Sequence, residues 1–521
     1  MRIERVKNAS RNMVYGTALQ IVKLVIPFVM RTVILYLLGV EYLGLNSLFT
    51  SVLSVLNLAE LGVGSAMVYS MYKPIVEDDI EKICALMRLY KIYYRIIGIV
   101  VCALGLLLLP FIPNLISGDV PADINIYVLY LLDLSITVLS YWLFAYKSSI
   151  LQAYQRTDVI SKATLISETL KYGLQFIVLA IFHSYYLYVL VNLLAQIFNN
   201  ILSAVFAQRM YPECKAIGVL PREEQKSINH RIRDLFTAKI GTVVVYSADT
   251  IVISAFLGLT ALAVYQNYYY LFTAVTSLIT IIFTSVRAGL GNSLIIDSRE
   301  KVFSDFQTFM LIITWLAGFC SACFLCLYQP FMELWVGPDL LLDFGVVILM
   351  VIYFFVNCLN NFLNSYKDAS GMWHEDRFRP LVSAGINLGL NIFLVQYIGL
   401  YGIVLSTILS MLFVGPWLIS NLFRLIFGLK NVSAFLKRLG YYVLVSALAV
   451  MSSYLACGLI HLPLIGTVVV RLVVCCLCAN LIFFLFCHRL PEFAQCLRLA
   501  DHMLGGRLQK ICDVLSHEKN Q

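Results

Sequence analysis

Long apolar segments follow one another along almost the whole chain, and short connections carry the charged and turn-forming residues. A helix needs about 20 mostly apolar residues to cross the hydrocarbon core of a bilayer. The pattern predicts an all-α polytopic membrane protein with 14 transmembrane helices. The predicted spans are 14–38, 45–72, 92–112, 126–148, 160–182, 185–207, 236–257, 262–286, 305–328, 341–365, 380–397, 400–423, 439–460 and 465–487.

Composition excludes a water-soluble chain of this length. Only 13% of the 521 residues are charged and 60% are hydrophobic, whereas soluble domains carry about 25% charged residues. A soluble chain would fold into several domains with polar surfaces, and this one lacks the charge to cover them. The net charge of +8 does not indicate nucleic-acid binding, because the basic residues follow the order of the predicted spans.

The basic residues predict the orientation of the spans. Lys and Arg gather in the N-terminal tail and near the connections that follow even-numbered spans, and cytoplasmic loops carry such an excess. We therefore expect a multi-pass membrane protein with both termini in the cytoplasm. The connections after odd-numbered spans hold no Lys or Arg, as in 39–44, 113–125, 183–184, 329–340 and 461–464.

The sequence contains an internal repeat. Three short stretches in the first half recur in the second half, in the same order and at offsets of 219, 212 and 216 residues. Because six spans separate the matching stretches, the two halves have the same orientation, as in parallel repeats about an axis along the membrane normal. The matching stretches are Leu38–Leu45 with Leu257–Val264, Leu151–Gln155 with Leu363–Lys367, and Gly173–Gln175 with Gly389–Asn391.

Spans and repeat together predict five regions, with spans 13 and 14 as an addition to two six-helix lobes. Such an architecture is typical of alternating-access transporters, whose site lies between the repeats. The predicted regions are an N-lobe at 1–208, a cytoplasmic linker at 209–235, a C-lobe at 236–424, spans 13 and 14 at 425–487, and an amphipathic cytoplasmic tail at 488–521.

Several stretches resemble bacterial polysaccharide flippases of the multidrug/oligosaccharidyl-lipid/polysaccharide exporter superfamily. They are residues 31–49, 58–64, 72–74, 153–158 and 248–253 with Asn267 and Tyr268, and the resemblance covers roughly residues 5–425. It implies a V-shaped pair of six-helix lobes around a central cavity. It also implies that the substrate is an undecaprenyl-pyrophosphate-linked oligosaccharide, moved from the inner to the outer leaflet for cell-surface polysaccharide biosynthesis.

Ionisable and amide side chains inside the predicted spans are the candidate site residues, because such groups are costly in a membrane and usually face a bundle interior or a wet cavity. Cations outnumber acids deep in the spans of the first half, and a diphosphate would compensate them. We expect Lys23, Arg31, Lys171 and Lys239 to hold the pyrophosphate. The predicted substrate site also includes Asn57, Glu60, Asp249, Asn360 and Asn364.

These polar faces have a structural alternative. They could serve only to pack helices together, with Glu60 or Asp249 neutralising a neighbouring cation. The asparagines of span 10 could instead hydrogen-bond glycan hydroxyls. A tyrosine cluster that includes Tyr265 and Tyr268 is either an interfacial aromatic belt or a surface on which sugars stack.

The sequence predicts a transporter without catalytic residues, cofactor or metal. The outer connections are short and hold no basic residue, which disfavours a glycan polymerase or ligase. A drug antiporter of the same superfamily carries cations and would need more acids in its cavity. Cys320, Cys323 and Cys326 lie on one predicted helix, but no His or acid joins them there, so a zinc site is not expected. Expected partners are the lipid-linked oligosaccharide, membrane lipids, a proton or sodium as coupling ion, and glycan assembly enzymes.

Overall fold

The structure is a computed structural model that describes residues 5–118 and 120–503, with no side chains described at 5–7, 9–10, 234, 237–239, 242, 282–289, 373, 500 and 502–503. Every regular element in these residues is a helix, as the apolar segments predict. The first nine are α1 (Arg5–Leu37), α2 (Val40–Leu56), α3 (Val63–Val76), α4 (Ile80–Leu108), α5 (Ile126–Trp142), α6 (Ser148–Ala153), α7 (Thr157–Phe182), α8 (Tyr185–Met210) and α9 (Arg222–Ile296). The others are α10 (Arg299–Val336), α11 (Phe344–Ala369), α12 (Trp373–Asp376), α13 (Arg379–Ile398), α14 (Leu400–Leu422), α15 (Val432–Gly458), α16 (Leu464–Cys487) and α17 (Pro491–Met503).

Among the described residues, 12 helices are long and apolar enough to cross a membrane, or 13 if one bent pair counts as a span. The chain is therefore a multi-pass membrane protein, and the predicted number of 14 is not confirmed. The difference from 13 lies in α9, where the single candidate Val243–Ile281 overlaps both predicted spans 236–257 and 262–286. Two helices meet inside α9 at Gly258, whose φ of 89° and ψ of 176° are not helical.

Two of the predicted spans are interrupted. A short 3-10 helix, η1 (Asn57–Glu60), separates α2 from α3, and Gly62 begins α3 with a φ of 90°. In predicted span 4, α5 is followed by a second helical segment, Ala145–Ala153, at an angle of 46°. Breaks of this kind expose backbone groups, which a membrane tolerates only inside protein or beside a cavity.

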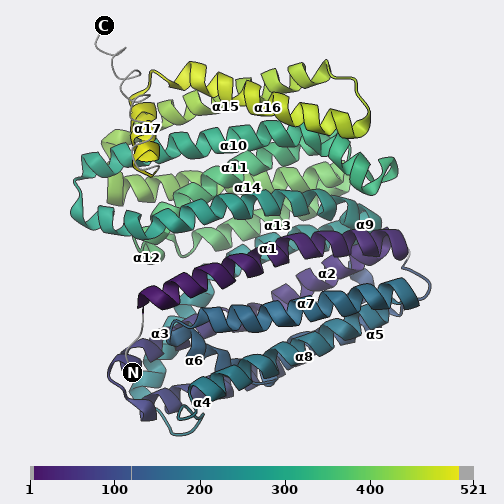
Figure 1. Cartoon of the computed structure of the whole chain (residues 1–521), viewed down its shortest axis with the longest axis vertical. Helices are drawn as coiled ribbons and strands as arrows, with labels where there is room; N and C mark the ends of the chain where they lie inside the picture. Colours follow the sequence, from purple (N-terminus) through teal and green to yellow (C-terminus); the bar gives the residue numbers. More distant parts are fainter. Residues whose placement is uncertain (1–4, 119, 504–521) are drawn as a thin grey trace. The chain divides into compact units, whose positions relative to one another are not determined.

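The chain forms two compact units, Met1–Gln266 and Asn267–Gln521. In the first unit, α1 packs along α7, and α7 packs along α8, as Figure 1 shows. Helix α5 lies between α4 and α8. At the end of α4, the η2 segment (Leu109–Leu115) leads into the connection to α5. The first unit therefore contains all six predicted spans of the N-lobe together with the first part of α9.

In the second unit, α10 is the central helix, because α11, α15 and α16 all pack against it. Helices α13 and α14 form an antiparallel pair that contacts α11 through α14. Helix α17 also contacts α10, and Figure 1 shows it lying across one end of this helix. Glu492 on α17 accepts an ion-pair contact from Arg438 on α15 at 2.9 Å. The additional helices α15 and α16 are thus integrated into the unit through α10.

The internal repeat is visible in the backbone. Residues with positive φ, where a turn reverses the chain, recur in the two halves at nearly the offsets found in the sequence. Gly39 and Gly258 are 219 residues apart and share a ψ near extended values, 170° and 176°. The further pairs are Gly118 with Gly337, Gln155 with Gly371, and His183 with Gly399, at offsets of 219, 216 and 216 residues.

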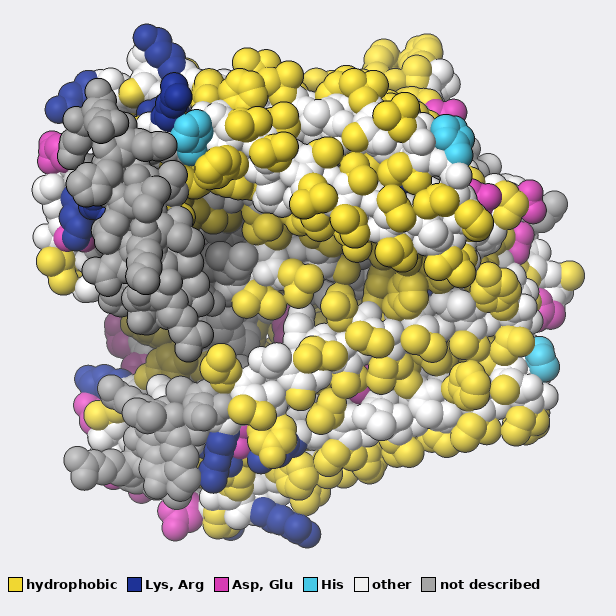
Figure 2. Space-filling view, turned by 45° about the horizontal axis from the view of Figure 1, so that its top comes forward, with side chains coloured by type: hydrophobic (Ala, Val, Ile, Leu, Met, Phe, Trp, Pro, Cys, Tyr) yellow, Lys and Arg dark blue, Asp and Glu magenta, His cyan; other side chains and the backbone are white. Residues whose placement is uncertain are grey.

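The surface matches a membrane-embedded chain. Figure 2 shows hydrophobic side chains along the helix sides of both units, and the Lys and Arg side chains visible on this face lie toward one end of the helices. Many large apolar side chains on the outer helices are more than 40% exposed, such as Leu455 and Leu477. In water such a surface would be a liability, whereas lipid covers it without cost.

Candidate functional site

Helices α1 and α7 run parallel, and two contacts fix their register. Asn12 on α1 accepts a hydrogen bond at 2.7 Å from the backbone N–H of Asp158 on α7. The ammonium of Lys162 lies 4.1 Å from the ring centre of Tyr15. Both contacts join residues about 146 positions apart in sequence. Since both helices rise by about 1.5 Å per residue, this register places Lys23 at the level of residues 169–170.

Lys23 lies near the middle of the candidate span Arg11–Leu37, and its side chain is exposed. It makes no ion pair with any group in the part of the chain that the structure describes. Gln20, one turn earlier on the same face of α1, is also exposed. Because an uncompensated ammonium is costly in hydrocarbon, this face of α1 is suited to a polar cavity rather than to lipid.

Lys171 is compensated within its own helix. Its ammonium lies 2.6 Å from a carboxylate oxygen of Glu168 and 4.2 Å from the ring centre of Tyr172. Lys171 is therefore not an unpaired cation in this structure, and its contact with pyrophosphate stays a prediction. The register nevertheless brings the Glu168–Lys171 pair to the level of Lys23 on the neighbouring helix.

Arg31 belongs to a second polar group nearer the other end of α1. The charges of Asp133 on α5, Arg31 on α1 and Glu168 on α7 all act on the hydroxyl of Tyr188 on α8. Four helices of the first unit thus bring ionisable side chains together. Our reading of the sequence missed Asp133, although an acid inside the apolar span 126–148 carries the same signal as Glu168.

Glu60 is held by hydroxyl groups. Its two carboxylate oxygens accept hydrogen bonds from Tyr94 at 2.5 Å and from Tyr141 at 2.9 Å. Tyr90 donates to Tyr94 at 2.8 Å, and the Tyr141 hydroxyl also lies 3.0 Å from Asn57 Oδ1. The break at η1 aims this carboxylate and Asn57 at the Tyr141 hydroxyl. The partners come from α4 and α5, so periodicity within span 2 could not reveal them.

A polar pocket of about 350 Å³ opens beside this break. It is bounded by α2, η1, the start of α3 and one residue of α9. Asn57 and Glu60, both predicted as site residues, are among its lining groups. The full lining is Ser54, Asn57, Glu60, Leu61, Gly62, Gly64, Ser65 and Val243.

Two predicted site residues, Lys239 and Asp249, belong to α9. Asp249 is buried, with 7% of its surface exposed, between the buried Ser247 and Thr250. Gln266 donates to the Thr250 hydroxyl at 2.9 Å. The side chain of Lys239 lies outside the described residues, and its predicted contact with pyrophosphate stays a prediction.

In the second unit, the asparagine face of α11 is engaged with other side chains. Asn364 Oδ1 accepts a hydrogen bond at 2.7 Å from Arg379, whose guanidinium also forms a two-pronged ion pair with Asp376 at 2.6 and 2.8 Å. Asn364 Nδ2 donates to the Asn360 carbonyl at 2.8 Å. Asn364 therefore anchors the start of α13, and glycan binding by Asn360 and Asn364 stays a prediction.

The tyrosine cluster is largely internal. Tyr265 and Tyr268 are 1% and 0% exposed. The Tyr268 hydroxyl donates to Gln329 at 2.7 Å and accepts from the Leu342 backbone N–H at 3.2 Å. Protein covers the faces of these two rings, so sugars cannot stack on them in this structure. Tyr269 and Tyr270, the other members of the cluster, are half-buried, and for them sugar stacking and an interfacial belt both stay predictions.

Comparison with known families gives the chain its context. The sequence profile of the family described as polysaccharide biosynthesis proteins matches residues 9–287, which is more than half of the chain. The chain belongs to this family. The match spans the candidate site residues from Lys23 to Asp249. A comparison with curated proteins finds none that matches.

Solved structures show the fold of this family member. The chain is similar to the lipid II flippase MurJ, with a TM-score of 0.64 and 13% identity over 91% of this chain and 98% of that one. It is also similar to a multidrug resistance MATE transporter of the MOP superfamily, with a TM-score of 0.59 and 14% identity over 78% and 94% of the two chains. A Vibrio cholerae MATE transporter, VcmN, gives a TM-score of 0.53 at 13% identity over 80% and 97%. The chain thus has the fold of MOP-superfamily transporters.

This family member also has a basic pocket of about 530 Å³ where α3, α4 and the start of α9 meet. Lys73, Lys82 and Arg231 line it. Lys82 is paired with Glu224 at 2.8 Å, and the Arg231 guanidinium lies 4.8 Å from the ring centre of Tyr69. The sequence analysis did not predict this pocket, because packing brings its residues together from two segments, 69–86 and 224–231, that are far apart in the sequence.

Proposed function

We propose that this protein flips undecaprenyl-pyrophosphate-linked oligosaccharide from the inner to the outer leaflet of the bacterial cytoplasmic membrane, by alternating access and without a catalytic step. Family membership supports a role in polysaccharide synthesis. The lipid II flippase fold supports a lipid-linked substrate. In this proposal both termini are cytoplasmic, a proton or sodium ion supplies the coupling, and glycan assembly enzymes are partners.

Lys23 is the observation that carries the proposal. Its exposed ammonium lies near the middle of a candidate span and forms no ion pair with any side chain that the structure describes. A cationic drug would be repelled there, whereas a diphosphate would be attracted. In this proposal the Lys23 ammonium is a mobile point charge beside the diphosphate. The Arg31 guanidinium, further along the same helix, offers two parallel N–H donors to the phosphate oxygens.

The Glu168–Lys171 pair gives the site a second cation, which becomes available when a diphosphate binds. When a diphosphate approaches Lys23 at the same level, Lys171 can exchange Glu168 for phosphate oxygens. The pair thus keeps the lysine compensated while the site is empty, which lowers the cost of a charge in the membrane. Lys239, Asn57 and Asp249 complete the proposed cavity on the other helices.

The test is export by a strain that depends on this chain, with lipid-linked oligosaccharide measured in each leaflet. We expect Lys23→Ala and Arg31→Ala to abolish export and to leave the substrate in the inner leaflet at normal protein abundance. Lys23→Arg should restore most of the export, because it keeps the charge. Lys437→Ala is the control, since it removes an exposed cation from α15.

Two outcomes contradict the proposal. Normal export by both alanine variants shows that Lys23 and Arg31 are not needed to bind the substrate. Transport of an organic cation by the purified protein in vesicles, with no movement of a lipid-linked oligosaccharide, favours a drug antiporter instead. A membrane polymerase or ligase is excluded if lipid-linked units of unchanged length cross the bilayer in vesicles that contain this protein alone.

A further inference from the structure

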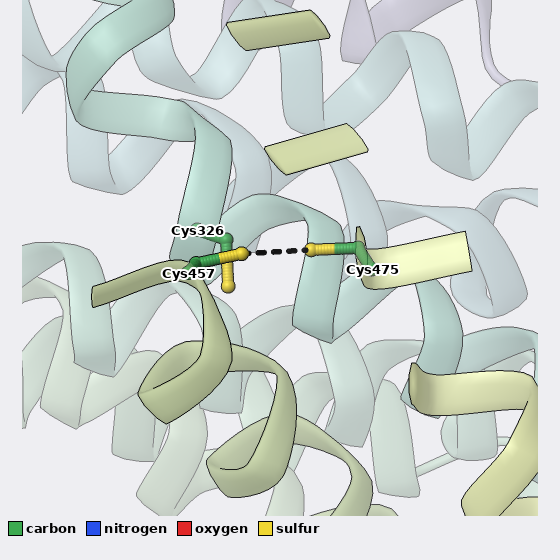
Figure 3. Close-up of side chains that lie close together, drawn as sticks. All are labelled: Cys326, Cys457 and Cys475. Atoms are coloured by element: carbon green, nitrogen blue, oxygen red, sulfur yellow. Dashed lines mark hydrogen bonds between the residues drawn. The ribbon is translucent and has the colours of Figure 1, made fainter. Parts of the chain in front are cut away.

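Three helices of the second unit bring their cysteines to one point. Cys326 comes from α10, Cys457 from α15 and Cys475 from α16, and each is at most 2% exposed. Their sulfur atoms all lie within 4.8 Å of one another. Figure 3 shows the three side chains converging, with a thiol contact of 3.9 Å between Cys457 and Cys475. Cys323, one turn before Cys326 on α10, packs against this cluster.

We propose that these cysteines form a structural zinc site that fastens α15 and α16 to α10. Cys326, Cys457 and Cys475 supply three thiolate ligands, and Cys323 supplies the fourth. Each thiol gives up its proton when it binds the metal. This site is independent of substrate transport and of the proposed function.

The geometry favours a metal over a disulfide. Two sulfurs bound to one zinc at about 2.3 Å in a tetrahedral site lie about 3.8 Å apart. The 3.9 Å between Cys457 and Cys475 is close to this separation, whereas a disulfide needs about 2.05 Å. The third sulfur, which lies within 4.8 Å of the other two, has no role in a disulfide but can be a ligand in a zinc site.

Arg471 provides the electrostatic complement. It lies one turn before Cys475 on α16, and its Nη1 is 3.4 Å from the Cys326 carbonyl oxygen. Its Nε is buried and has no hydrogen-bond partner within the described part of the chain. Four thiolates and one Zn²⁺ carry a net charge of −2, and this guanidinium offsets one unit of it. A thiolate bound to the metal also remains a hydrogen-bond acceptor for a buried N–H donor.

The site lies next to the hairpin that joins α15 to α16. Cys457 is the residue before the last of α15, and only the connection 459–463 separates that helix from α16. The site also gives the two helices beyond the repeat a specific attachment, since apolar packing between helices in lipid has no hydrophobic driving force.

The test measures zinc on the full chain in detergent after treatment with a chelator and a reductant. One equivalent of Zn²⁺ is added, unbound metal is removed, and bound zinc is determined by mass spectrometry. We expect about one zinc per chain and a higher melting temperature. Cys457→Ser and Cys475→Ser should lose the zinc, whereas Cys476→Ser should keep it, because Cys476 is an exposed neighbour. Wild-type zinc at background, or equal loss in Cys476→Ser, overturns the proposal.

A second measurement avoids variants that fail to fold. The unmodified chain is alkylated with and without Zn²⁺, and the modified peptides are identified by mass spectrometry. Zinc should slow alkylation of Cys326, Cys457 and Cys475 at least tenfold and leave Cys476 unchanged. Equal rates with and without the metal, a Cys457–Cys475 disulfide in the freshly purified protein, or loading with copper in place of zinc each contradict the assignment.

Discussion

At the scale of single residues, Glu60 shows how a carboxylate is accommodated in an apolar span. Tyr94 and Tyr141 donate to it. Its removal leaves the Tyr94 hydroxyl without this acceptor, while Tyr141 keeps Asn57 Oδ1 at 3.0 Å. We expect Glu60→Ala to destabilise the protein by about 1–3 kcal/mol, measured as a lower melting temperature in detergent. Glu60→Gln should cost less, because the amide oxygen still accepts one bond. Equal melting of Glu60→Ala and the wild type contradicts this account.

Gly44 supports a second prediction at the same scale. An alanine Cβ at this position would lie 2.4 Å from the Leu259 carbonyl oxygen, so α2 and α9 must separate. Nearby, the Ser117 backbone N–H donates to the carbonyl of the fully buried Ser254 at 2.9 Å. We expect Gly44→Ala to increase labelling of a Ser254→Cys variant by an impermeant thiol reagent. Gly16→Ala is the matched control, because nothing lies within 4 Å of its Cβ.

The labelling is compared with a parent chain that lacks Ser254→Cys, since the native cysteines also react. Unchanged labelling in Gly44→Ala means that the close approach at Leu259 does not hold this end of the unit closed. An equal increase in Gly16→Ala assigns the effect to general loosening and also contradicts the prediction.

At the scale of elements, α17 is attached to the unit through its polar face. Arg438 on α15 pairs with Glu492, which is 4% exposed, and Gln495 donates to Ser304 on α10 at 3.0 Å. We expect Arg438→Ala to release α17, because a buried carboxylate without its cation is costly. Trypsin should then cleave after Arg489 several-fold faster in detergent. Lys437→Ala, which removes an exposed cation next to it, should cleave at the wild-type rate.

The elements also show what the sequence could and could not predict. Long apolar runs with charged ends predicted the helices, because burial in lipid depends on composition alone. Repeated Leu-Gly turns predicted the shared backbone at Gly39 and Gly258. Contacts between helices distant in sequence were beyond this reasoning. The tyrosines around Glu60 and the cysteines that join Cys326 are fixed by packing, which one sequence does not reveal.

At the scale of the whole molecule, the number of crossings in α9 decides the topology. The candidate Val243–Ile281 has 39 residues, which as one straight helix would be about 58 Å long. That is nearly twice the thickness of the hydrocarbon core. The break at Gly258 divides it into two stretches, and Leu257–Val264 repeats the turn of Leu38–Leu45. We therefore expect two crossings within α9.

Cysteines placed on either side of this region test the expectation. Between Ser227 and Asp339 the chain contains α10 and the candidate span in α9, so two crossings in α9 put these two residues on opposite sides of the membrane. Both side chains are exposed. In intact cells, Asp339→Cys should react with an impermeant thiol reagent and Ser227→Cys should react only after the membrane is opened, each relative to the parent chain. If both react from the same side, α9 crosses once, and the predicted count of 14 spans and the parallel repeat are both wrong.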